Sequence, residues 1–319
     1  EVLIQTADRI ENRNPYYCDI CRVNIDTGEL TPILSTDHEY TVQEDRFTPS
    51  PISTGVSPSG DYIVTTQTRI DEVPVSLLID REGNAPLVLE TADISAMPDN
   101  WRWPEPVMVK GADNKTDIHG IIYRPSDFDP EKTYPVIDLS WGHSPPITPF
   151  IGGWMFYGAL AWAELGFIVV KFGNRGGGLR DKAFHDDINP ALPHYNKDDC
   201  AAGIRQLVER YPYMDIDRVG VASMTLYPEA LTGLLIHPDL YKVGVDINPM
   251  SDARLMPVIG NFGGGLKFPP HENFVNNLRG KLLLIHGMME DVVLVASTFR
   301  LVEALQKANK HFDMLVLPN

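Results

Sequence analysis

The chain reads Asp217-Arg218-Val219-Gly220-Val221-Ala222-Ser223-Met224-Thr225-Leu226-Tyr227-Pro228 at the point that decides its fold. Residues 218–222 form a short apolar run, which is typical of a strand that a parallel sheet buries on both faces. Five further runs of this kind are residues 135–139, 167–172, 243–247, 281–286 and 312–317. The sequence therefore predicts a mostly parallel sheet of short buried strands.

Amphipathic segments separate these apolar runs. Residues 154–165 are followed by Gly166, and glycine commonly ends a helix. Residues 198–211 and 294–308 place their apolar side chains at helical spacing. Strand, helix and strand repeated in this way predict a doubly wound α/β domain with right-handed crossovers. In such a sheet, functional groups collect at the carboxyl ends of the strands.

The first hundred residues have a different character, with short β-rich runs broken by turn residues. Residues 17–25 and 29–34 flank Asp26-Thr27-Gly28, which predicts a hairpin with glycine at its turn. A second unit of strand, turn and strand spans residues 62–89 and starts about 45 residues after the first. This spacing favours the blades of a β-propeller, and a plain β-sandwich is the alternative.

Length and charge narrow the range of functions. The chain has 319 residues, which predicts two domains, and the change of pattern divides it into residues 1–99 and 100–319. A net charge of −16 repels nucleic acid and anionic membranes. No run reaches the roughly 18 apolar residues of a membrane span. We therefore expect neither a nucleic-acid partner nor a membrane-spanning segment.

No motif indicates a cofactor or a metal. Cys18 and Cys21 form a lone C-x-x-C pair without a second pair at zinc-ligand spacing, and Cys200 stands apart. The glycine runs 176–178 and 263–265 lack the spacing and flanking residues of nucleotide-binding loops. We expect structural or incidental cysteines and no cofactor.

Five short sequence motifs follow one another along the second domain. They are Ile122-Tyr123-Arg124-Pro125-Ser126-Asp127-Phe128-Asp129-Pro130, Tyr134-Pro135-Val136-Ile137-Asp138, Asn174-Arg175-Gly176-Gly177-Gly178, Asp217-Arg218-Val219-Gly220 and Leu283-Leu284-Ile285-His286-Gly287. In this order they resemble the hydrolase domain of bacterial dipeptidyl peptidase IV-like members of the prolyl oligopeptidase family. The first hundred residues resemble the end of the β-propeller that precedes that domain.

The resemblance implies a fold, an activity and a setting. The fold would be an α/β-hydrolase preceded by propeller blades, and the activity would be cleavage of short peptides by a Ser, Asp, His triad, often after proline or alanine. It implies a peptide substrate, allows a homodimer and favours a periplasmic or secreted location. Because the chain opens with Glu1 and stops at Asn319 directly after a strand-like run, we expect it to be part of a longer protein whose hydrolase domain continues further.

The nucleophile of such a hydrolase stands in a G-x-S-x-G turn, the nucleophile elbow, between a strand and a helix. Counted from the start of the strand, Ser223 replaces the first glycine, Thr225 the serine, and Tyr227 and Pro228 the small residues that follow. Counted back from the end of the next helix, the position falls on Met224. A threonine can attack through its hydroxyl, although its β-methyl crowds a strained turn. We predict Thr225 as the candidate nucleophile and Ser223 as a strand residue.

The resemblance also places the other two members of the triad. The acid position follows His286-Gly287 and falls on Glu290, with Asp291 beside it. Family members usually carry Asp here, and Glu can fill the same orienting role. The alternative is a solvated pair of loop carboxylates. The catalytic histidine is expected beyond Asn319.

The oxyanion donors are altered as well. Relatives use a tyrosine in the loop that follows the strand at residues 135–139, whereas this chain carries Ser140 and Trp141 there. We predict these two side chains and the backbone N–H of Leu226 as donors.

Two function classes remain open. One is a serine-type peptidase-family hydrolase with an altered elbow, and the other is a catalytically dead pseudo-peptidase that binds a peptide or a protein.

Overall fold

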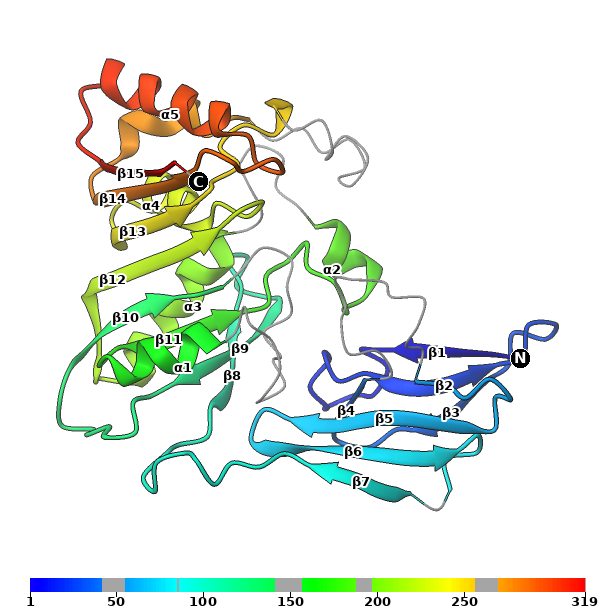
Figure 1. Cartoon of the computed structure of the whole chain (residues 1–319). Helices are drawn as coiled ribbons and strands as arrows, with labels where there is room; N and C mark the ends of the chain where they lie inside the picture. Colours follow the sequence, from blue (N-terminus) through cyan, green and yellow to red (C-terminus); the bar gives the residue numbers. More distant parts are fainter. Residues whose placement is uncertain (42–54, 85, 141–156, 188–196, 256–268, 319) are drawn as a thin grey trace. The chain divides into compact units, whose positions relative to one another are not determined.

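The computed structural model describes residues 1–41, 55–84, 86–140, 157–187, 197–255 and 269–318 (Figure 1). The chain divides into two compact units. The first consists mainly of Glu1–Glu105, and the second of Pro106–Pro146, Gly158–Gly178 and Ala183–Asn319. The division falls at residue 105, close to the change of sequence pattern at residue 99.

The first unit contains two antiparallel sheets. The strands are β1 (Val2–Thr6), β2 (Asp19–Val23) and β3 (Leu30–Leu34) in one, and β4 (Glu39–Thr41), β5 (Tyr62–Arg69), β6 (Glu72–Asp80) and β7 (Leu87–Thr91) in the other. The predicted hairpin is β2–β3, and Gly28 in its turn has a φ of 73°. Ile63, Leu77 and Ile79 pack against Leu3 and Ile33, so the two sheets share a small core. That these sheets are propeller blades stays a prediction.

The second unit is built on an eight-stranded sheet in the order β15-β14-β13-β12-β10-β11-β9-β8. Strand pairing is parallel from β11 to β15, and β9 pairs antiparallel with β11. The bounds are β8 (Glu105–Lys110), β9 (Asp117–Tyr123), β10 (Tyr134–Asp138), β11 (Ile168–Phe172), β12 (Met214–Met224), β13 (Tyr241–Ile247), β14 (Lys281–Gly287) and β15 (Asp313–Leu317). The predicted mostly parallel, doubly wound sheet is confirmed.

Helices alternate with these strands. They are α1 (Tyr157–Glu164), α2 (Lys182–Asp186), α3 (Lys197–Arg210), α4 (Glu229–Ile236) and α5 (Val295–Lys307), with short 3₁₀ turns η1 (Ala253–Leu255) and η2 (His271–Asn277). The three helices predicted from spacing correspond to α1, α3 and α5. Among the described residues, none of the helices has both the length and the apolar character needed to cross a membrane.

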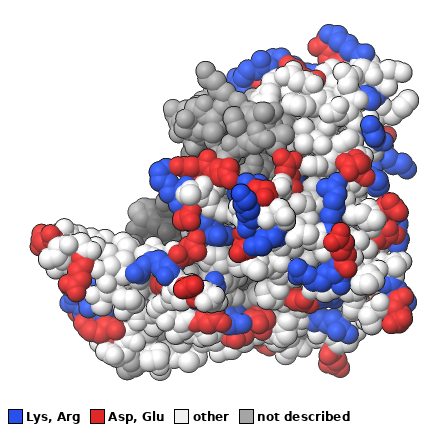
Figure 2. All heavy atoms as spheres, turned by 180° about the vertical axis from the view of Figure 1, so that it is seen from behind, with Lys and Arg blue, Asp and Glu red and all other residues white. Residues whose placement is uncertain are grey.

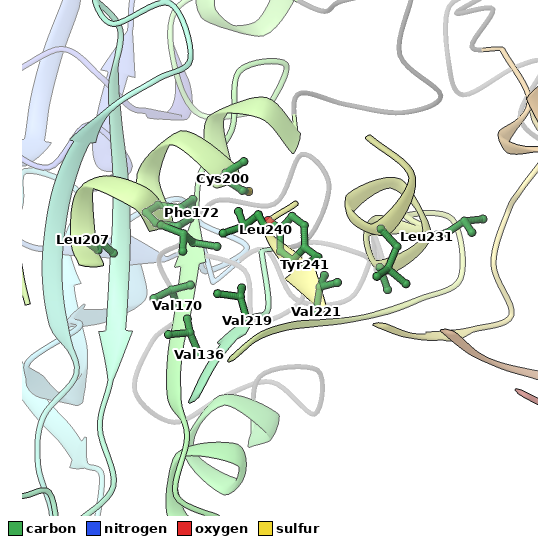
Figure 3. Packing of buried hydrophobic residues seen from close by; sticks show 14 of the residues in the cluster. Val136, Val170, Phe172, Cys200, Leu207, Val219, Val221, Leu231, Leu240 and Tyr241 are labelled. Carbon is green, nitrogen blue, oxygen red and sulfur yellow. The ribbon is translucent and has the colours of Figure 1, made fainter. Parts of the chain in front are cut away.

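The main core of the second unit lies between the sheet and its helices (Figure 3). Val136, Val170 and Phe172 come from the strands, and Cys200 and Leu207 come from α3. The helix approaches β11 closely, since a Cβ on Gly203 would lie 2.9 Å from Cζ of Phe172. Burying each large apolar side chain contributes about 1.5–3 kcal/mol, so this layer holds the strand ends in place.

The surface carries both signs of charge. On the face in Figure 2, Lys and Arg side chains are interspersed with Asp and Glu. Pairs such as Lys307 with Glu303 lie mostly in solvent, where an ion pair contributes about 0–1 kcal/mol. The stability of the unit therefore rests on its interior.

We expect the substitution Phe172→Ala to lower the free energy of unfolding by about 3–5 kcal/mol, because it leaves a cavity against α3. Phe299→Ala is the matched control, since Phe172 is 1% exposed and Phe299 is 46% exposed. Urea denaturation of both variants measures the difference. Equal losses of stability would contradict this view of the core.

Candidate active site

The ends of three neighbouring strands form the candidate site. Thr225 follows β12, Asn248 follows β13, and Glu290 lies shortly after β14. In the sheet register Met224 pairs with Ile247, and Ile247 pairs with Ile285. Because the strands are parallel, their carboxyl ends lie side by side at one edge, where ligands bind in open α/β sheets.

Thr225 occupies a sharp bend of the backbone. Its φ is 61°, in the left-handed region where a β-branched residue is an outlier. Its N–H donates to the carbonyl of Ile247 at 2.7 Å, and its carbonyl accepts from Met250 N–H at 3.1 Å. Such a conformation costs about 1–3 kcal/mol and persists only where its surroundings fix it. The bend therefore falls on Thr225, while Met224 is the last residue of β12.

The first turn of α4 is capped from the sheet. Pro228 is the N-cap residue and makes no side-chain capping bond. Instead, the hydroxyl of Ser223 on β12 accepts from Ala230 N–H at 2.8 Å, and Oδ2 of Asp246 on β13 accepts from Leu231 N–H at 3.1 Å. These contacts satisfy donors that a helix leaves unpaired at its start. Ser223 is thus a strand residue, as predicted, and its hydroxyl holds α4.

The carboxyl of Asp246 is protonated at neutral pH. Burial raises its pKa from 3.8 to about 8 and outweighs the hydrogen bond from Leu231 N–H, which lowers the pKa. A neutral carboxyl avoids the cost of an isolated buried charge.

Glu290 is held in one orientation by three donors. Its Oε1 accepts from the N–H groups of Val292 at 2.8 Å and Val293 at 3.0 Å. Its Oε2 accepts from Nδ2 of Asn248 at 2.8 Å, and Oδ1 of Asn248 accepts from Gly287 N–H at 3.0 Å. Glu290 is half-buried, whereas Asp291 is exposed. Of the two loop carboxylates, Glu290 is therefore the anchored one.

Both ring nitrogens of His286 make hydrogen bonds inside the fold. Its Nδ1 lies 2.8 Å from Oγ1 of Thr298, and its Nε2 lies 3.0 Å from the carbonyl of Val293. Burial lowers its pKa, so the neutral imidazole donates to the carbonyl from Nε2 and accepts from the hydroxyl at Nδ1. This histidine joins β14 to α5.

Of the three predicted oxyanion donors, the structure describes Ser140 and Leu226, and it places them in different surroundings. Ser140 is 1% exposed, and its hydroxyl accepts from Phe172 N–H at 2.9 Å, so it is engaged in joining two strands. Trp141 lies outside the described residues. The Leu226 side chain packs against Met250 and Val293. Within the described part of the chain its backbone N–H has no acceptor, which leaves that donor available at the turn.

Sequence reasoning missed a buried cluster of charged side chains beside this edge. Nζ of Lys197, the first residue of α3, lies 2.8 Å from Oδ2 of Asp138 and 3.7 Å from Oε2 of Glu229. The Tyr241 hydroxyl donates to Asp138 at 2.6 Å. All four side chains are fully buried. The signal was present in the sequence, because Asp138 stands inside an otherwise apolar strand run.

The cysteines and acidic groups do not form a metal site in the described residues. Cys18, Cys21 and Cys200 are buried thiols. Burial raises the pKa of Cys200, which keeps it protonated.

The chain belongs to the prolyl oligopeptidase family. The model of that family matches residues 154–261 and 266–319, which include β12, the bend at Thr225 and the Glu290 loop. The family assignment agrees with the mostly parallel sheet of an α/β-hydrolase domain.

Similar proteins carry the names of dipeptidyl peptidases. Dipeptidyl peptidase 8 of Homo sapiens is 26% identical over 225 residues, which are 63% of this chain and 24% of that protein. "Probable dipeptidyl-aminopeptidase B" of Emericella nidulans is 22% identical over 320 residues, 93% of this chain and 33% of that protein. The chain thus spans a quarter to a third of these curated relatives.

A solved structure has the same fold. The crystal structure of Porphyromonas gingivalis dipeptidyl peptidase 4 superposes with a TM-score of 0.75 at 22% identity, over 99% of this chain and 44% of that one. At this identity the likeness is one of fold.

We expect the stability of the protein to carry a pH dependence from Asp246. In the unfolded chain this carboxyl releases its proton near pH 3.8, and in the folded protein near pH 8. The folded state binds more protons between these values, so the free energy of unfolding falls as pH rises through this window and levels off above it. Asp246→Asn removes this contribution. Urea denaturation at several pH values should show that the free energy of unfolding falls with pH more steeply in the wild type than in the variant, by up to about 1.4 kcal/mol per pH unit. Identical pH dependences would contradict this prediction.

The Glu290 anchor predicts a local effect on its loop. Glu290→Ala removes the acceptor of two N–H groups, so amide hydrogen exchange at Val292 and Val293 should become about five- to tenfold faster. Asp291→Ala is the control, because that side chain is exposed. The same acceleration in both variants would mean that Glu290 does not order the loop.

Proposed function

We propose that this chain carries the nucleophile and the acid of a dipeptidyl peptidase-like, serine-type hydrolase, with Thr225 as nucleophile and Glu290 as the orienting carboxylate. The observation that carries the proposal is the left-handed bend at Thr225, at the end of β12, with only β13 between it and β14, which leads into the Glu290 loop. A strained bend at this place is what exposes the nucleophile in an α/β-hydrolase. Family membership and the names of the relatives support the same reaction class.

The chemistry assigns one task to each group. The Thr225 hydroxyl attacks the peptide carbonyl after giving its proton to an imidazole, which we predict beyond Asn319. Glu290 keeps that imidazole in the required tautomer, as the acid of a triad does. The Leu226 N–H stabilises the oxyanion, and the absence of another acceptor for it among the described residues supports this role. Ser140 is less suited, because it is only 1% exposed. Trp141 stays a predicted donor.

The names of the relatives support a substrate class. A short peptide, cleaved after its second residue, suits proteins called dipeptidyl peptidases. The homodimer and the periplasmic or secreted location stay predictions that the resemblance suggests.

A pseudo-peptidase that binds a peptide or a protein is the second candidate. It is favoured by the residues of the bend itself, since Thr225 is β-branched and Tyr227 and Pro228 stand where the elbow has small residues. In this case the bend serves to present a surface, and the Thr225 hydroxyl has no chemical role.

The two candidates differ in how they respond to changes at Thr225. The full-length protein is assayed with a proline-containing dipeptide chromogenic substrate. If it is a hydrolase, Thr225→Ala abolishes turnover, and Thr225→Ser raises it because the crowding methyl is removed. Glu290→Gln lowers kcat by about 10³–10⁴-fold, whereas Asp291→Asn leaves it unchanged.

A binding protein gives the opposite pattern. The wild type and Thr225→Ser would then lack turnover, and peptide affinity measured by calorimetry would be the same in the wild type and in Thr225→Ala. That result would overturn the hydrolase proposal.

A further inference from the structure

The buried cluster of Asp138, Lys197 and Glu229 joins three elements at the edge of the sheet that carries the candidate site. Asp138 ends β10, Lys197 begins α3, and Glu229 begins α4. Each side chain is fully buried. Nζ of Lys197 lies between the two carboxylates, at 2.8 Å from Asp138 and 3.7 Å from Glu229. We refer to these three residues as the ion triad.

The charges of the ion triad depend on one another. Burial alone would lower the pKa of Lys197, but the carboxylates of Asp138 and Glu229 outweigh it and hold that pKa above its ordinary value. The ammonium is therefore fixed in a position that helix geometry disfavours, because the start of a helix carries partial positive charge. Asp138 is held further by the Tyr241 hydroxyl at 2.6 Å. The lysine stays at the start of α3 because of its two partners.

Glu229 links the ion triad to the bend. It follows Pro228 directly, and its N–H donates to the carbonyl of Tyr227 at 2.8 Å. Only four residues, 225–228, separate the end of β12 from the start of α4. The first of them, Thr225, is fixed by backbone bonds to Ile247 and Met250. The segment is thus held at one end by β13 and the loop that follows it, and at the other end by Glu229.

From this arrangement we infer that Lys197 is a positioning residue for the elbow, which acts through Glu229 to fix the start of α4 and the 225–228 segment. The ion triad is more than a source of stability. Replacing a buried ion pair by apolar side chains is often neutral or stabilising, so stability alone does not explain three buried charges. The ion pairs of Lys197 link β10, α3 and α4 in one arrangement. The part of this inference that concerns catalysis rests on the proposed function. The part that concerns the order of the 225–228 segment does not depend on it.

Two variants of the full chain test the inference by amide hydrogen exchange. Glu229→Gln removes one charge and keeps the shape of the side chain. The variant Asp138→Leu/Lys197→Met/Glu229→Leu replaces the whole ion triad by apolar groups. We expect the amides of residues 225–227 and 229–231 to exchange at least about tenfold faster in both variants. The thermal stability of the triple variant should match or exceed that of Lys197→Met, because the latter leaves two carboxylates unpaired. Lys307→Met/Glu303→Gln, a solvated ion pair on α5, is the control and should leave these amides unchanged.

Unchanged exchange of the amides of residues 225–227 and 229–231 in Glu229→Gln would overturn the inference, and that variant decides the matter if the triple variant does not fold. The activity measurement separates this outcome from failure of the proposed function. If the wild type cleaves the chromogenic dipeptide, Glu229→Gln should lower kcat by about tenfold or more with KM unchanged, because the nucleophile is misplaced after substrate binds. A wild type without turnover would remove the hydrolase proposal and leave the exchange result standing.

Discussion

The arrangement of the site depends on the backbone hydrogen bonds that tie Thr225 to its neighbours. The bond to Ile247 extends the pairing of β12 with β13 by one residue, and the bond from Met250 closes the bend from the other side. A threonine in the left-handed region is unfavourable by itself, so these contacts must offset the strain. Without glycine at this place, the conformation comes from the sheet and not from the local sequence.

Polar side chains near the bend also restrain the start of α4. Ser223 and Asp246 cap the first turn of α4, one as a hydroxyl and the other as a neutral carboxyl. Lys197 and its two carboxylate partners lie in the same region as buried charges. Replacing buried charges of this kind by apolar side chains is often neutral or stabilising, so stability alone does not account for them. Residues 224–228 include neither glycine nor serine, yet hydrogen bonds and ion pairs from neighbouring elements support this segment.

The sequence was sufficient for the sheet and insufficient for its polar interior. Alternating apolar runs and amphipathic segments predict β10 to β15 with α1, α3 and α5, because burial periodicity is a local property. Counting along the strand places the bend at Thr225, and the structure finds the left-handed residue there. The roles of Ser140 and Lys197 could not be predicted, because each depends on partners more than thirty residues away in the chain. The family resemblance gave Glu290, but only the structure reveals Asn248 as its support.

Pro228 has an effect on the ensemble of unfolded conformations. Its ring restricts its own backbone and disfavours a helical conformation for Tyr227, so the chain before α4 samples fewer states when unfolded. Its φ of −76° in the folded protein is compatible with the ring. Such a proline reduces the entropy lost on folding, typically by about 0.4–1 kcal/mol. Pro228 thus offsets part of the strain at Thr225, and it keeps α4 from extending backward into the bend.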